Sequence, residues 1–109
     1  PAIFAKSQNY ALSDVQLISA KAAECRAAAA LSEVLTEWYL LIRPPSDSYY
    51  ESWRTKIDSA DSEIIAGLEA FDTALDLTPD RWQEIKVKEL EILEWRALSE
   101  QIRTLILGE

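Results

Sequence analysis

Two short breaks constrain this 109-residue chain more than any other feature of its sequence. The first is Arg43-Pro44-Pro45-Ser46-Asp47-Ser48, and the second is Leu77-Thr78-Pro79-Asp80. Proline disfavours helical backbone at the residue before it, so each break should end one helix and precede the next. Apolar side chains recur at helical spacing in the three runs around the breaks. We therefore predict helices over about 14–42, 49–77 and 79–107.

The composition supports an all-α fold. Only two glycines are present, no proline interrupts a long run, and alanine, leucine, glutamate and isoleucine are common. Hydrophobic residues make up 49% of the chain, which is enough for a single core. Short links between long helices favour neighbours that run in opposite directions. The sequence thus predicts an antiparallel (up-down-up) three-helix bundle over 13–109, preceded by a short N-terminal arm over 1–12.

The first predicted helix begins with a capping-box pattern, Ser13 followed by Gln16. Its first half is rich in alanine and contains the only cysteine, Cys25, so no disulfide can form within the chain. Small neighbours favour a buried thiol that fills an alanine-sized space. The alternative is a reactive or regulatory cysteine, which needs an activating neighbour.

The second predicted helix carries the most regular apolar pattern of the chain. Its apolar residues alternate in steps of four and three, typical of a narrow helix-packing seam: Trp53, Ile57, Ala60, Ile64, Gly67, Phe71 and Ala74. Glycine within a helix costs about 1 kcal/mol relative to alanine. Gly67 therefore predicts that another backbone approaches closely at that point.

The third predicted helix is apolar on two sides. One side, which includes Ile85, Ile92 and Ile102, suits the core. The other side consists of Trp82, Leu90, Leu93 and Ala97. This second side either packs internally, against the first helix and the arm, or contacts another subunit.

An acidic stripe follows the second predicted helix, opposite its seam. It consists of Glu51, Asp58, Asp61, Glu69, Asp72 and Asp76, in a chain with a net charge of −8. Anions near a helix C-terminus are unfavourable, so we expect Lys86 and Lys88 or an external cation to compensate Asp72 and Asp76. The stripe is either a solvated face or a binding face for a basic protein.

Aromatic side chains surround the first break. Trp38, Tyr39, Tyr49 and Tyr50 lie there with Arg43. Tryptophan, tyrosine and arginine dominate the energetics of many interfaces, so this aromatic end is a candidate recognition patch. The alternative is that the rings close the end of the core and keep their polar atoms at its rim.

The sequence argues against several functional classes. It contains no histidine, no glycine-rich phosphate loop and no metal-ligand motif, so we expect neither catalysis nor a cofactor nor a bound metal. The acidic balance argues against direct nucleic-acid binding. No apolar run is long enough to span a membrane, and no signal-peptide pattern is present, so we expect a cytoplasmic location.

These features favour a non-enzymatic protein–protein interaction or assembly subunit, which self-associates or joins a larger complex. A small virion or phage-assembly component is one form of this class. The alternative is a soluble acidic antagonist or immunity-type protein that occludes a basic site on its partner. A third option is a small-molecule binder between the helices at the alanine-rich end.

Overall fold

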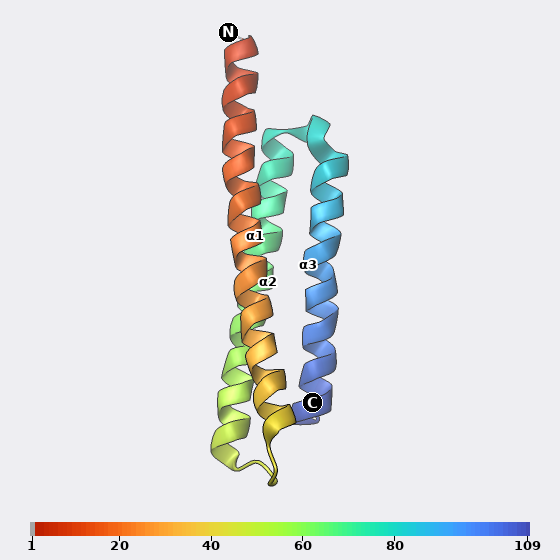
Figure 1. Ribbon diagram of the computed structural model, residues 1–109. Coiled ribbons are helices and arrows are strands. Elements are labelled where there is room, and N and C mark those ends of the chain that lie inside the picture. The colour runs from red at the N-terminus through yellow and green to blue at the C-terminus, as the bar shows by residue number, and fades with distance from the viewer. Residues whose placement is uncertain (1) are drawn as a thin grey trace.

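The computed structural model describes residues 2–109, and the side chains from residue 3 onward. These residues form three long helices and no strand. The helices are α1 (Ala2–Leu40), α2 (Asp47–Leu77) and α3 (Trp82–Ile102). They lie side by side in an extended molecule of 65 × 18 × 18 Å (Figure 1). The all-helical class predicted from the sequence is confirmed.

Two short helical turns flank α3. The 3₁₀ turn η1 (Pro79–Arg81) precedes it, with Thr78 at the N-cap position. The π-helical turn η2 (Arg103–Leu107) follows it. Gly108 ends the chain's last turn with a φ of 73°, a left-handed conformation that glycine adopts without a steric cost, and its N–H donates to the Thr104 carbonyl.

The predicted N-terminal arm is wrong for the part of it that the structure describes. Residues 2–12 are helical and continue into α1 without a break, while residue 1 lies outside the described residues. Ser13 does not cap a helix. Its buried hydroxyl shares a hydrogen bond of 2.8 Å with the Thr78 hydroxyl, which itself donates to the Ala74 carbonyl. The polar residue thus serves a helix–helix contact, and the first turns of α1 extend beyond the α2–α3 link (Figure 1).

The predicted seam of α2 forms the centre of the core. All seven of its residues are buried, together with Ala70. Helix α1 packs mainly against α2 and presents the small buried residues Ala20, Ala23 and Ala27. A Cβ atom added to Gly67 would lie 3.6 Å from the Ala20 carbonyl oxygen and would collide with Cδ1 of Ile92. The backbone of α1 therefore lies in van der Waals contact with this position, but the Ile92 side chain, rather than a second backbone, is what excludes a Cβ atom.

Side chains of α1 hold the α2–α3 link in place. Asp14 accepts a hydrogen bond of 2.7 Å from Arg81, which also binds Glu84. Tyr10 donates to Asp80, and its ring lies 5.4 Å from the Arg81 guanidinium. The link that the second break predicts is therefore fixed to a segment some seventy residues earlier in the chain.

We predict that Gly67→Ala destabilises the protein, because its methyl group would overpack the site that Ile92 fills. Overpacking of this kind costs about 1–3 kcal/mol, more than the roughly 1 kcal/mol that alanine gains in helix propensity. Chemical denaturation would measure the difference. In an Ile92→Val background, which lacks Cδ1, the same substitution should be neutral or stabilising. An equal cost in both backgrounds would contradict the packing account.

Candidate interaction surfaces

The second apolar side of α3 faces away from the core over most of its length. Trp82, Leu90 and Ala97 are exposed, and Leu93 is half-buried. The core side instead buries Ile85, Ile92 and Ile102, as the sequence predicts. The second side was predicted either to pack internally or to contact another subunit. Trp82, Leu90 and Ala97 do not pack internally.

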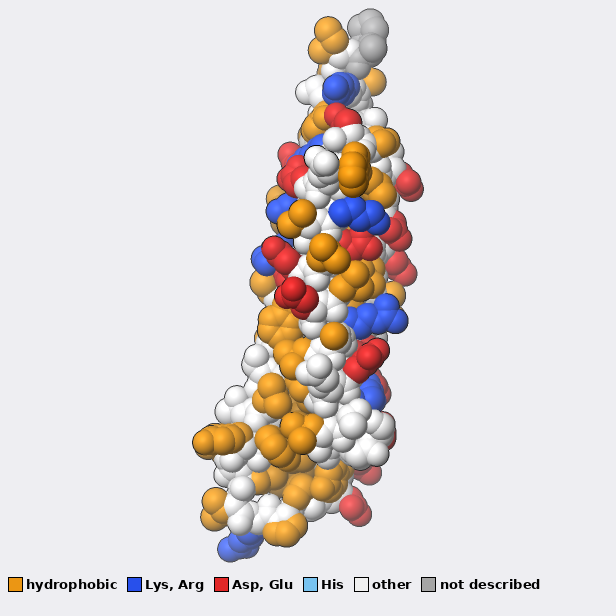
Figure 2. Space-filling view, turned by 90° about the vertical axis from the view of Figure 1, so that its right-hand side faces the viewer, with side chains coloured by type: hydrophobic (Ala, Val, Ile, Leu, Met, Phe, Trp, Pro, Cys, Tyr) orange, Lys and Arg blue, Asp and Glu red, His pale blue; other side chains and the backbone are white. Residues whose placement is uncertain are grey.

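Figure 2 shows the face on which α3 lies. Hydrophobic side chains gather over its lower half, whereas charged side chains of both signs are spread over its upper half. The lower half corresponds to the C-terminal part of α3, where Leu105 is exposed and Trp95 and Leu98 are half-buried. Ala97, Glu100, Gln101, Thr104 and Leu105 line a shallow hollow there. This part of the surface is therefore mainly apolar or uncharged, with Glu100 as a charged member.

The acidic stripe of α2 is divided into two parts. Arg103 of η2 binds Asp58 at 2.6 Å and Asp61 at 2.9 Å, and Asp61 also accepts from the Ser99 hydroxyl. Glu51, Glu69, Asp72 and Asp76 are exposed and have no ion pair among the described residues. The two aspartates bound by Arg103 therefore serve the fold, and the four others form the acidic surface.

The expected compensation of Asp72 and Asp76 by α3 is not found. Lys86 instead binds Glu89, one turn away on its own helix, at 3.1 Å. Lys88 turns toward α1 and lines a hollow beside Phe71. Both lysines lie on parts of α3 that do not face these two aspartates, so the internal alternative is wrong for this pair.

The aromatic end separates into a buried part and an exposed part. Tyr50 packs edge-on against the fully buried Trp53 with ring centroids 5.7 Å apart, and Tyr49 lies 5.6 Å from the same ring. Tyr50 and Trp53 close the end of the core. Tyr49 is 40% exposed and Trp38 38%, and Tyr39 and Arg43 are exposed as well.

A charged cluster behind Trp53 joins α1 to α2. The indole N–H donates to Glu37 at 3.1 Å, and Lys56 donates to Glu37 at 2.7 Å and to Glu33 at 3.0 Å. The Lys56 hydrogen bond, followed by that of Trp53, holds the pKa of Glu37 below its usual value of 4.5. The pKa of Lys56 is raised, chiefly by Glu37. Each group favours the charged form of the other.

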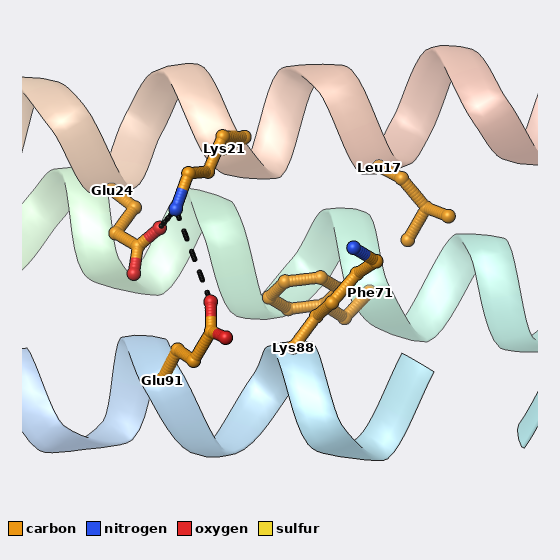
Figure 3. A pocket seen from close by; sticks show the side chains of 6 residues that line it. All are labelled: Leu17, Lys21, Glu24, Phe71, Lys88 and Glu91. Atoms are coloured by element: carbon orange, nitrogen blue, oxygen red, sulfur yellow. Dashed lines mark hydrogen bonds and ion pairs between the residues drawn. The ribbon is translucent and has the colours of Figure 1, made fainter. Parts of the chain in front are cut away.

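A hollow of about 170 Å³ lies between α1 and α3, with Phe71 of α2 beneath it. Figure 3 shows Lys21 between Glu24 of the same helix and Glu91 of α3. The lysine nitrogen lies 2.7 Å from Glu24 and 3.9 Å from Glu91. The hydrogen bond that Lys21 donates to Glu24 is the main reason that the pKa of Lys21 is raised.

This hollow is a poor binding site for an organic molecule. Ligand pockets usually enclose about 300–1,000 Å³ and are mostly apolar, whereas charged side chains of both signs line this smaller space. Three of them, Lys21, Glu24 and Glu91, pair with one another. Within residues 2–109 no group of three or more acidic or cysteine side chains is placed to hold a metal ion. The hollow is best described as a cross-helix ion cluster.

The expected burial of Cys25 is wrong. The thiol is exposed because Ala20, Ala23 and Ala27 face α2, which turns position 25 to the opposite side of α1. Sequence reasoning also missed that this opposite side is apolar, with Val15 and Ile18 exposed. The signal was present in the sequence, since the segment over 2–40 has no continuous polar face.

Comparison with protein-family models, curated proteins and solved structures finds no match for this chain. Within the described residues, no helix combines the length and the low charge that crossing a membrane requires. Functional inference therefore depends on the surfaces described above.

We predict that Glu37→Gln lowers the melting temperature at pH 7 by about 4–8 °C, which corresponds to roughly 1 kcal/mol for the weakened charged hydrogen bonds. The folded-state pKa of Glu37 lies below its unfolded value. Its stabilising effect is therefore complete above about pH 5 and is lost as the pH falls through the folded-state pKa. Thermal unfolding between pH 7 and pH 3 should show a smaller pH dependence in the variant.

Glu33→Gln is the matched control, because Glu33 also binds Lys56 but is more exposed. Glu33→Gln should lower the melting temperature less than Glu37→Gln does, and it should reduce the pH dependence of unfolding less. Equal effects of the two substitutions would show that Glu37 has no special role.

Proposed function

We propose that this protein is a non-enzymatic interaction and assembly subunit, built as an antiparallel, up-down-up three-helix bundle. It contacts copies of itself or the members of a larger complex. The observation that carries the proposal is the second apolar side of α3, where 54% of Trp82 and 60% of Leu90 remain exposed.

The spacing of this side suits a protein partner. Trp82 and Ala97 are fifteen residues apart, so the side extends over about 22 Å along the helix. Exposed tryptophan and leucine side chains gain about 25 cal/mol for each Å² that a partner removes from water. Lys86 lies on the same side, one turn from both Trp82 and Leu90, so the apolar surface is interrupted there. Apolar residues spaced along one side of a helix fit the groove or the helix face of another protein better than a small ligand.

The charge distribution is consistent with this role. The sequence has no histidine, and three of the charged side chains around the hollow between α1 and α3, Lys21, Glu24 and Glu91, are paired with one another. These features favour a binding protein over an enzyme. We extend the proposal to a cytoplasmic location, or a virion if the complex is a viral particle.

The second candidate function is that of an acidic antagonist that occludes a basic site. Its support is the exposed part of the acidic stripe, in particular Glu69, Asp72 and Asp76. It is the weaker candidate because Arg103 already binds Asp58 and Asp61, which leaves a shorter anionic surface for a partner.

We predict that the protein forms concentration-dependent oligomers and that Leu90→Glu weakens them. A charge placed at the centre of an apolar contact would have to be buried without a partner, which is costly. Static light scattering coupled to gel filtration would measure the mass. Gln83→Glu, which adds the same charge at another exposed position of α3, is the control and should have no effect.

A mass that never exceeds that of the monomer would contradict self-association. An oligomer that Leu90→Glu leaves unchanged would contradict the role of α3 in it.

A further inference from the structure

We propose that the outer face of α1 pairs with the same face of a second copy of this chain, in antiparallel orientation. The inference rests on the proposed assembly function, but it concerns a surface that is separate from the apolar side of α3.

The six most exposed large hydrophobic side chains of the described residues all belong to α1 or to the link directly after it. Ile42 is 94% exposed, Ile3 88% and Ile18 70%, and the others are Tyr39, Phe4 and Leu40. Helix α1 has no continuous polar face, although exposed charged residues stand along it. It is covered by α2 and α3 on one side only, so exposed apolar side chains remain on its outer face.

The outer face of α1 has a regular pattern of its own. Its residues recur in alternating steps of four and three, as in the seam of a coiled coil. None is charged, and all are exposed except the half-buried Ala22. We call this set the outer seam: Ala11, Val15, Ile18, Ala22, Cys25, Ala29, Ser32 and Thr36.

The sizes of these side chains indicate a second copy as the partner. The large members, Val15 and Ile18, lie in the N-terminal half of the seam, and the C-terminal half has small members such as Ala29 and Ser32. Two antiparallel copies place Ile18 opposite Ala29 and Val15 opposite Ser32, each twice. The distance between the helices then stays even along the contact, whereas a parallel pair would be wide at one end and narrow at the other.

The same arrangement covers the exposed ends of α1. In this register the first turns of one copy lie beside the C-terminal end of the partner's α1, so Phe4 comes within about one turn of Leu40 in the other chain. The most exposed apolar residues at the two ends of α1 therefore meet each other. The N-terminal turns that extend beyond the α2–α3 link gain a surface to pack on (Figure 1).

The area available for this contact is modest. Helix α1 has 39 residues and is therefore about 58 Å long, and one helix face is about 10 Å wide. In this register residues 7–40 of the two helices overlap over about 51 Å. Each copy therefore offers roughly 500 Å², and the pair would bury about 1,000 Å² in total, below the usual range of stable specific interfaces. We therefore expect a dimer of modest affinity.

The first test compares Ile18→Glu with Leu90→Glu and with the Gln83→Glu control, by sedimentation equilibrium. Ile18→Glu should raise the dimer dissociation constant by about 100-fold or more, because the contact would bury an unpaired charge. The side chain is exposed in the monomer, so circular dichroism should show unchanged helix content. Leu90→Glu and Gln83→Glu should leave this dimer intact.

The second test determines whether the two α1 helices of the dimer run antiparallel or parallel. In a Cys25→Ala background, Ala11→Cys together with Thr36→Cys places two thiols opposite each other between antiparallel copies. Within one chain these positions are twenty-five residues apart on a straight helix, about 37 Å, too far for a disulfide. The double variant should form a covalent dimer under mild oxidation, and each single cysteine variant should not.

Three results would overturn the inference: a monomer at all concentrations, a dimer unaffected by Ile18→Glu, or self-crosslinking of the single Ala11→Cys variant, which indicates a parallel pair. A dimer that Leu90→Glu disrupts and Ile18→Glu does not would reject the α1 pairing and support the α3 surface. These outcomes distinguish a failure of the α1 pairing from a failure of the proposed contact through α3.

Discussion

The close approach of α1 to α2 determines most of this structure. Ala20 and Ala23 of α1 face Gly67 of α2, so the two backbones lie in close contact, and a methyl group added to Gly67 would collide with Ile92 of α3. Small residues fill little volume, and Ile92 of α3 occupies the space that remains. The tight pair therefore sets the position of the third helix. It also turns the larger apolar residues of the first half of α1, such as Ile18, away from the core.

Cations are scarce in this acidic chain, and several of them connect separate helices. Arg81 joins the start of α3 to Asp14 of α1, Lys56 joins α2 to Glu37 of α1, and Arg103 joins η2 to Asp58 of α2. Exposed ion pairs contribute little each, but these three position segments that are distant in the sequence. The excess negative charge remains on the surface, where it limits indiscriminate association through the apolar faces.

Sequence reasoning was most successful where one periodicity dominated. The regular seam of α2 and the two proline breaks predicted the helices and the core residues of α2 well. Prediction from the sequence failed for α1, because the sequence of a helix without a polar face does not reveal which side is buried. Cys25 was therefore predicted to lie on the buried side, whereas it is exposed. Ser13 was misassigned because a capping pattern is equally compatible with a polar contact inside a longer helix. The ion pair between Arg103 and Asp58 depends on the π-helical turn η2, which local helix propensity does not predict.

The first turns of α1 have a further consequence for dynamics. Residues 3–9 are all exposed, yet they extend a helix that is already nucleated, so adding or removing each residue changes the free energy by only a few tenths of a kcal/mol. Such an end melts and reforms within about a microsecond. Its amide hydrogens should exchange rapidly in an isolated chain, and a weak contact is enough to protect them. The length of ordered helix at this end is therefore set by what surrounds the molecule rather than by its own sequence.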